Sequence, residues 1–502
     1  MAGRAVPLTV GLAVLLLTFG PLAMVAAHAQ GGWGADGPAL RFTVLQAALS
    51  AVISVALAVP VARALARRHF RGRGALIALL GAPFLLPVIV AVLGLLAVFG
   101  RAGLVNQALG TVGLSIPIYG LHGVVLAHVF LNMPLAVRLI LQGWQAIPAE
   151  RMRLALSLGL GPRDIARHLE RPMLKAVLPG TLAVIFAICL TSFAVALTLG
   201  GGPRATTVEL AIYQSLRFQF DLGRAASLAA LQFLLCAAAV LLAGRFAAPS
   251  GFGRGLDRVI PFAPAGWRRS ADAAVLTLAT LFLAVPLAMV AWRGLAGLGD
   301  LPPSVWGAAA RSVGLALGAT ALTLGAALTL ALSPARWAGV VATLPLAASS
   351  LVMGTGLFLA LWPLLPPERV ALPVTLVVNA TLALPFAFRI LHPAAQTLRQ
   401  DYGRLADSLG LRGMARLRWL VLPRLRAPLG FAAGVSAALS MGDLGVIALF
   451  AAPDGPTLPL LVQQLMGAYR MEQAAGAALL LVVLSFALFF IFDWGGRRGS
   501  DL

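Results

Sequence analysis

The chain has 502 residues, of which 60% are hydrophobic and only 11% are charged. A soluble domain of this size needs more charge to cover its surface, and apolar runs of roughly 20 residues recur, so the composition excludes a soluble globular protein and predicts membrane spans. The net charge of +21 could suggest a nucleic-acid partner, but the arginines lie between the apolar runs rather than along one face. We therefore expect a lipid bilayer, and no nucleic acid, around this chain.

The apolar runs predict an all-α polytopic membrane protein with about 12 transmembrane helices. Residues 1–29 end in Ala27-His28-Ala29, which resembles a signal-peptidase site, but their apolar run is close to spanning length, so we expect an uncleaved first span. The other spans are predicted near 42–65, 75–99, 117–141, 176–199, 225–248, 273–297, 306–332, 338–362, 371–391, 428–450 and 473–493.

The spans group into two halves of six. Residues 1–248 form the first half, the Gly/Pro/Arg-rich residues 249–271 form a linker, and residues 272–502 form the second half. Because six is an even number, the halves run parallel and would be related by an axis along the membrane normal. Arginine is richer in the even-numbered loops, which predicts that these loops and both termini are cytoplasmic.

One polar segment occurs twice, at 147–172 in the first half and at 396–423 in the second. Arg153–Pro172 (RLALSLGLGPRDIARHLERP) and Arg404–Pro423 (RLADSLGLRGMARLRWLVLP) lie 251 residues apart, and 12 of 26 positions are identical when 151–176 is aligned with its copy. A repeat at half the chain length indicates duplication and fusion. We call 147–172 and 396–423 the twin segments.

The pattern of each twin segment predicts a short amphipathic helix, a glycine stop and a second short helix. Gly159 suits the residue after a helix end and Pro162 suits the first residue of the next helix. The second segment repeats this with Gly410 and a break near Gly413. Two such helix–turn–helix units on one face would suit a two-fold symmetric partner, whereas ordinary cytoplasmic loops would not need the fixed Gly-to-Pro spacing of 13 residues.

These segments resemble the coupling loops of ABC-importer permeases, with the pattern E-A-A-x-x-x-G-x(9)-I-x-L-P. Leu420-Val421-Leu422-Pro423 matches its end, whereas Leu169-Glu170-Arg171-Pro172 departs from it, and arginine replaces the first Glu in both copies. A fused two-half permease resembles the iron(III) and thiamine branches. Residues 197–221 (LTLGGGPRATTVELAIYQSLRFQFD) and 440–450 (SMGDLGVIALF) resemble the thiamine-uptake permeases.

The resemblance implies that each twin segment inserts into an ATP-hydrolysing subunit and transmits its closure. The residues expected to couple to that ATPase are Ala155, Ser157, Leu158, Gly159, Leu169, Pro172, Ala406, Ser408, Leu409, Gly410, Leu420 and Pro423. The partners implied are two copies of a P-loop ATPase and a periplasmic solute-binding protein. The implied location is the bacterial inner membrane.

The chain itself shows no nucleotide site, because a P-loop needs Gly-Lys and the only lysine, Lys175, follows Leu174. We therefore expect a transport subunit rather than an enzyme, with no cofactor of its own and with ATP and Mg used by the partner. His122 and His128 lie in an apolar span and are expected to be structural or pore-lining. Cys189 and Cys236 also lie in apolar runs and are expected to act as small hydrophobic side chains.

Asp443 is an acidic residue within an apolar stretch, and the repeat places it opposite Ser192. A carboxylate at membrane depth faces a cavity or a partner, so Asp443 and Ser192 are candidates to line the path of a cationic solute. A helix–helix hydrogen bond, or a position near the outer interface, is the alternative for Asp443. Thr206, Glu209 and Thr457 lie in predicted outer loops and are candidates to contact the binding protein; the alternative is a solvated loop that merely re-enters the membrane.

These observations favour the permease subunit of an ATP-driven, binding-protein-dependent importer that works by alternating access, with thiamine and phosphorylated thiamine as cargo. The same class of permease for iron(III) or a polyamine is the first alternative. An ion-coupled secondary transporter is more remote, because it would need ionisable sites in matching positions of both halves, whereas Asp443 is matched only by Ser192.

Overall fold

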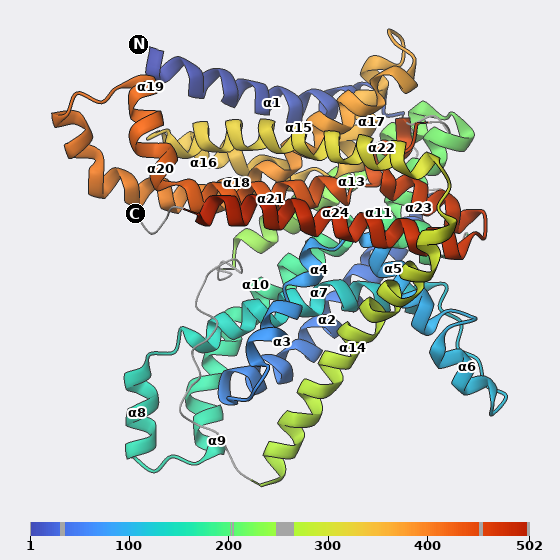
Figure 1. Ribbon diagram of the computed structural model, residues 1–502, viewed down its shortest axis with the longest axis vertical. Helices are drawn as coiled ribbons and strands as arrows, with labels where there is room; N and C mark the ends of the chain where they lie inside the picture. The colour runs from blue at the N-terminus through green and yellow to red at the C-terminus, as the bar shows by residue number, and fades with distance from the viewer. Residues whose placement is uncertain are drawn as a thin grey trace. The chain divides into compact units, whose positions relative to one another are not determined.

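The computed structural model describes residues 2–30, 36–200, 202, 205–246, 266–450 and 455–498 (Figure 1). Within these residues the chain is helical and contains no strand, so the predicted all-α class is confirmed. Eleven described helices are long and apolar enough to cross a membrane, and a pair bent by 90°, Arg336–Ala347 and Ser350–Leu361, can supply a twelfth span. The chain is a multi-pass membrane protein. Most of the predicted linker, residues 249–265, lies outside the described residues.

The helices before the linker are α1 (Ala2–His28), α2 (Gly37–Arg67), α3 (Arg73–Leu79), α4 (Ala82–Leu85), α5 (Val88–Phe99), α6 (Leu104–Gly110), α7 (Leu121–Gln145), α8 (Ala149–Ser157), α9 (Pro162–Ile165), the π-helical turn η2 (Ala166–Glu170), α10 (Arg171–Leu190), α11 (Phe193–Leu199), α12 (Val208–Gln214), the π-helical turn η4 (Ser215–Gln219) and α13 (Leu222–Gly244).

The helices after the linker are α14 (Trp267–Gly297), η5 (Leu298–Asp300), α15 (Ser304–Leu332), α16 (Arg336–Thr343), η6 (Leu344–Ala347), α17 (Ser350–Leu361), α18 (Pro367–Ser408), α19 (Gly413–Arg416), the π-helical turn η7 (Leu417–Val421), α20 (Leu422–Arg424), α21 (Arg426–Met441), α22 (Gly445–Phe450), α23 (Leu458–Gly467) and α24 (Met471–Arg497).

The sequence repeat is visible in the secondary structure. The short helices α9 and α19 begin and end 251 residues apart, and so do the π-helical turns η2 and η7. Each π-helical turn is followed closely by a proline, Pro172 or Pro423. Proline lacks an N–H group, and its ring clashes with the carbonyl four residues earlier, so a widened turn ahead of it relieves the helix in both copies.

The packing units differ from the two sequence halves. One unit comprises residues 1–35, 208–234 and 294–502, and the other comprises residues 36–207 and 235–293. We call them unit 1 and unit 2. Helix α1 therefore belongs to the unit built mainly from the second half, and most of α14 belongs to the unit built from the first half (Figure 1). The division into sequence halves 1–248 and 272–502 stays a prediction, because packing units do not test it.

Unit 2 is organised around the packing of α2 against α7 and α10. Helix α14 is attached to this group by an ion pair in which Arg68 Nε lies 2.7 Å from Asp272 Oδ2. The rings of Phe130 and Phe282 meet edge to face with centroids 5.7 Å apart. An ion pair and an aromatic contact therefore both hold α14 against helices that precede it by more than 100 residues in the sequence.

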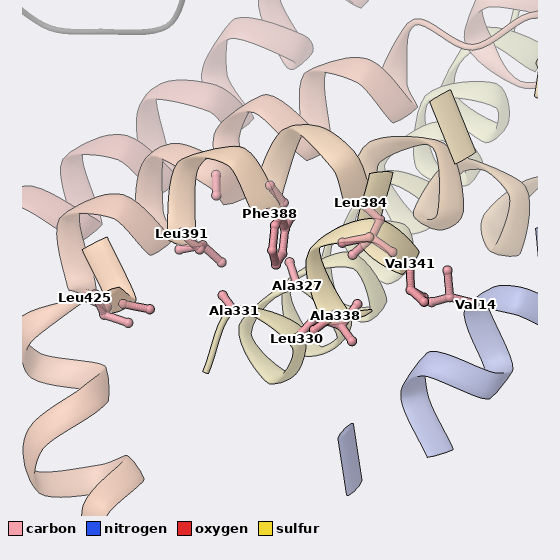
Figure 2. Packing of buried hydrophobic residues seen from close by; sticks show 14 of the residues in the cluster. Val14, Ala327, Leu330, Ala331, Ala338, Val341, Leu384, Phe388, Leu391 and Leu425 are labelled. Carbon is pink, nitrogen blue, oxygen red and sulfur yellow. The ribbon is translucent and has the colours of Figure 1, made fainter. Parts of the chain in front are cut away.

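Unit 1 is organised around α15, α18, α21 and α24. Figure 2 shows its apolar cluster, in which Phe388 and Leu391 of α18 lie close to Ala327 and Leu330 of α15. Val14 brings α1 into the same cluster. Farther along α1, the backbone at Pro21 approaches Gly356 of α17 so closely that a Cβ atom on Gly356 would lie 2.2 Å from the Pro21 carbonyl oxygen.

This close approach predicts that Gly356→Ala destabilises the protein. The added methyl group meets backbone rather than a flexible side chain, so α1 must move away from α17, at a cost of about 1–3 kcal/mol. The measurement is thermal unfolding of the purified protein in detergent. Gly325→Ala in α15 is the control, since a Cβ atom there meets nothing within 4 Å and the change favours a helix. Equal unfolding temperatures for the two variants would contradict the packing described.

Candidate coupling site

Both twin segments form the helix–turn–helix that the sequence predicts. In the first, α8 ends at Ser157, the chain turns at Gly159, and α9 begins at Pro162. In the second, α18 ends at Ser408, the chain turns at Gly410, and α19 begins at Gly413. The predicted helix end and helix start at Gly159 and Pro162 are confirmed.

The turn is a Schellman motif in both copies. Gly159 has φ of 67° and donates its N–H to the Leu156 carbonyl, while Leu160 donates to the Ala155 carbonyl. In the second copy Gly410 has φ of 68°, and Gly410 and Leu411 donate to the carbonyls of Asp407 and Ala406. The left-handed backbone at these positions favours glycine. A Cβ atom on either glycine would meet nothing within 4 Å, so the backbone angle alone requires glycine here.

Each turn is bordered by exposed leucines. Leu158 and Leu409 are 67% and 64% exposed, and Leu154 and Leu405, which also correspond in the repeat, are exposed as well. Exposed apolar side chains that cluster within a polar segment are typical of an interaction site. The two segments therefore present the same apolar surface at the end of their first helix.

The remaining predicted coupling residues have other positions. Ala155 and Ala406 are buried, so they pack inside the protein instead of facing a partner. The Ser157 and Ser408 hydroxyls donate to the carbonyls of Leu154 and Leu405 within their own helices. Leu169 and Leu420 are half-buried in the π-helical turns, while Pro172 and Pro423 are exposed. A coupling role for each of these residues stays a prediction.

Charged side chains surround both turns. Arg153 pairs with Glu150 in the first segment, and Arg416 pairs with Asp407 in the second, with N–O distances of 3.0 and 3.3 Å. Exposed pairs of this kind contribute little to stability, about 0–1 kcal/mol. Their exposure leaves them accessible to a partner.

Ser192 and Asp443 occupy the same break in matching helices. Ser192 lies between α10 and α11 of unit 2, and Asp443 lies between α21 and α22 of unit 1. The Asp443 carboxylate accepts the backbone N–H groups of Gly445 and Val446, while its Oδ2 atom is buried without a hydrogen-bond partner. An acceptor left open in this way is available to a donor or a cation. A role in the solute path stays a prediction for both residues.

Glu209 and Thr457 lie inside unit 1 rather than on an exposed outer loop. They are 1% and 3% exposed, because the short apolar helices α12 and α23 pack into the unit. Glu209 also accepts a weak hydrogen bond from Gln232, with a distance of 3.5 Å. Thr206 is partly exposed. The expectation of solvent-exposed loops was therefore wrong for Glu209 and Thr457, and contact with a binding protein stays a prediction.

His128 and the two cysteines are buried, as expected of structural residues, whereas His122, near the start of α7, is exposed. His128 is buried and shares a hydrogen bond of 3.1 Å with the Ser50 hydroxyl. Cys189 and Cys236 are both buried. Across the described residues, no group of three or more His, Cys, Asp or Glu side chains could hold a metal ion.

An all-α membrane protein with a repeated helix–turn–helix segment has the architecture expected of a permease of the ABC-transporter class. No protein-family model matches the chain. The thiamine transport system permease protein ThiP of Brucella abortus (strain 2308) is 41% identical over 97% of this chain and 95% of its own length. The protein of the same name from Escherichia coli (strain K12) is 38% identical over 90% of this chain and 88% of its own. The chain belongs to the family of thiamine transport system permease proteins.

A more distant relative matches only part of the chain. The molybdenum transport system permease protein ModB of Mycobacterium bovis is 32% identical over 209 residues, which is 41% of this chain and 78% of that protein. This match is shorter than one predicted half, and the relative is named for a different cargo. It agrees with the class and does not bear on the solute.

Proposed function

We propose that this chain is the membrane subunit of an ATP-driven, binding-protein-dependent importer of thiamine and phosphorylated thiamine. The observation that carries the proposal is similarity over nearly the whole chain to proteins named thiamine permeases. The cationic thiazolium ring of thiamine suits a path that contains a carboxylate with an open oxygen, as at Asp443. Iron(III) and polyamines are cations too, so the carboxylate by itself does not choose among them.

The twin segments support two copies of a separate ATPase as partners. Each segment offers the same pair of exposed leucines beside the same glycine turn, so one kind of subunit can bind both. ATP and Mg would be bound by that subunit, because the chain lacks a P-loop. The halves 1–248 and 272–502 would each contribute one docking segment.

The mechanism we propose is alternating access. A periplasmic binding protein delivers solute on the outside, and closure of the ATPase pair moves the twin segments on the inside. The binding protein and the ATPase each shift the equilibrium between the two states of the permease only if they bind one state more tightly than the other. The arginine-rich loops support a cytoplasmic position for the twin segments and both termini, in the inner membrane.

The solute is tested by ATP hydrolysis in the complete complex. Permease, ATPase and binding protein are reconstituted in vesicles, and ATPase activity is measured with thiamine, thiamine pyrophosphate, iron(III) or a polyamine. We expect stimulation by the two thiamine compounds. Stimulation by iron or polyamine alone would overturn the proposed cargo, and uptake that survives ATP removal but stops with the ion gradient would overturn the class of transporter.

The glycine turns provide a test of coupling. Gly410→Val forces a β-branched residue into left-handed backbone and should weaken uptake, and the double change of Gly159 and Gly410 to Val should abolish it. Gly410→Asn is the matched control, since asparagine tolerates this backbone and the space around the Cβ position is open. ATPase association is measured by co-purification. Normal association and uptake in the double valine variant would refute the coupling role.

Asp443→Asn tests the solute path. The amide keeps an acceptor for the Gly445 and Val446 N–H groups but removes the negative charge. We expect the KM for thiamine uptake to rise roughly tenfold, equivalent to about 1.4 kcal/mol, while the complex still assembles. Asp443→Glu keeps the negative charge and serves as the control. An unchanged KM in Asp443→Asn would remove this residue from the path.

A further inference from the structure

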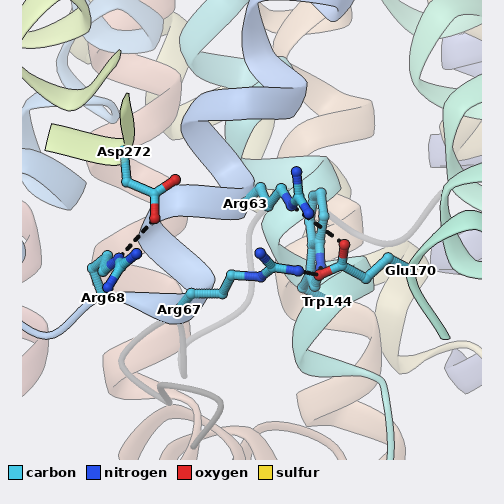
Figure 3. Close-up of polar contacts among 6 residues, drawn as sticks. All are labelled: Arg63, Arg67, Arg68, Trp144, Glu170 and Asp272. Carbon is cyan, nitrogen blue, oxygen red and sulfur yellow. Dashed lines mark hydrogen bonds and ion pairs between the residues drawn. The ribbon is translucent and has the colours of Figure 1, made fainter. Parts of the chain in front are cut away.

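A buried ion-pair cluster joins the first twin segment to the rest of unit 2. Figure 3 shows Glu170, the last residue of η2, with Arg63 and Arg67 of α2 and Trp144 of α7 around it. Arg67 Nη2 donates to Glu170 Oε1, Arg63 Nε lies 3.3 Å from Glu170 Oε2, and Trp144 Nε1 donates to Oε1 over 3.4 Å. The Arg67 and Glu170 side chains are only 4% and 6% exposed. The Arg67–Glu170 pair therefore lies in the protein interior, while the Arg63 side chain, 40% exposed, reaches it from the edge.

The second half has apolar residues at the corresponding positions. The repeat offset of 251 places Ala395 opposite Trp144 and Val421 opposite Glu170. Both belong to the apolar cluster of unit 1, together with Leu330 and Ala331 in the last turns of α15. The two segments thus have the same backbone at their turns, but ion pairs attach the first to its unit and apolar packing attaches the second.

The connection along the chain also differs. In the first half α7 ends at Gln145 and α8 begins at Ala149, because Pro148 lacks an N–H group and restricts the residue before it. In the second half Arg399 takes the place of Pro148, and α18 runs unbroken to Ser408. Arg399 Nη2 also donates to the Leu332 carbonyl over 3.2 Å, which joins α18 to the end of α15. The second segment is therefore a continuous extension of a span, whereas the first is not.

A buried ion pair is poorly explained as a device for stability alone. Desolvating the charges costs about as much as their attraction returns, and apolar side chains of similar volume often do as well or better. The second half, with Val421 in the same place, is an example within this chain. What the ion pairs add is a fixed orientation of the Glu170 carboxylate, because Arg67 contacts one of its oxygens and Arg63 lies beside the other.

We propose that Glu170 is a positioning residue that links the first twin segment to α2 and so replaces the continuous helix that serves this purpose in the second half. The proposal rests on the proposed function, since it concerns how movement of an ATPase reaches the permease. Movement of the first segment is transmitted through the Glu170 ion pairs to α2. Movement of the second is transmitted along α18 itself.

The test uses the complete complex in vesicles and measures thiamine transported per ATP hydrolysed. Glu170→Gln should assemble with the ATPase and still hydrolyse ATP, but its transport per ATP should fall at least threefold. The double variant Arg67→Leu with Glu170→Val copies the apolar chemistry of the second half. We expect Glu170→Gln to lower the unfolding temperature and the double variant to restore it. The double variant should still have the low transport ratio, because the helix between α7 and α8 is still interrupted at Pro148.

Asp272→Asn is the matched control, because it removes the neighbouring Arg68–Asp272 ion pair of unit 2, which does not involve a twin segment. It should leave the transport ratio unchanged. A normal ratio in Glu170→Gln, or recovery of both stability and ratio in the double variant, would overturn the proposal and leave Glu170 a structural residue. If Glu170→Gln does not fold, the double variant decides alone.

The glycine variants separate this proposal from the proposed function. If the double valine variant keeps normal uptake, the coupling function fails whatever Glu170 does. If the valine variants uncouple transport but the Glu170 variants keep the wild-type ratio, only the positioning role of Glu170 fails.

Discussion

A membrane interior has no water to satisfy backbone N–H and carbonyl groups, and this constraint governs the structure. Helices satisfy those groups within one segment, so the described residues contain helices and no strands. Interruptions of a helix are costly in such a setting and need their own hydrogen bonds. Outside the spans, the helix ends at Gly159 and Gly410 satisfy their carbonyl groups with the same pair of Schellman hydrogen bonds. A feature repeated in this way is set by backbone geometry, which few residues other than glycine can adopt.

The same constraint explains why the packing units depart from the sequence halves. Helices in lipid associate through close packing rather than through a hydrophobic driving force, so contacts at small residues matter. Gly356 allows the backbone of α1 to approach α17, and Gly94 allows α5 to approach Pro286 of α14. Neither unit is built from one half alone. Cutting the chain in the linker would therefore not release two halves that each contain a complete packing unit.

The sequence predicted those features that depend on periodicity or on a single backbone requirement. The apolar runs predicted the spans, and Gly159 with Pro162 predicted a helix end and a new start. It did not predict that Glu209 and Thr457 are buried, because a short apolar helix that packs into the protein looks like an outer loop when only full-length spans are counted. Nor did it reveal the partners of Glu170, which come from α2 and α7. The one available signal was a glutamate where the second copy has Val421.

The difference between Glu170 and Val421 shows what a duplication can and cannot change. The turn at each glycine admits few alternatives, since most larger residues there meet an unfavourable backbone angle, and both copies have glycine. The attachment behind the turn has many solutions of similar free energy, because a buried ion pair and apolar packing can replace each other at little net cost. Pro148 removes the helical connection in one half only, and the half that lacks the connection is the half with the ion pairs. The two halves thus carry the same exposed turn but join it to the spans in different ways, and the proposed role of Glu170 rests on that difference.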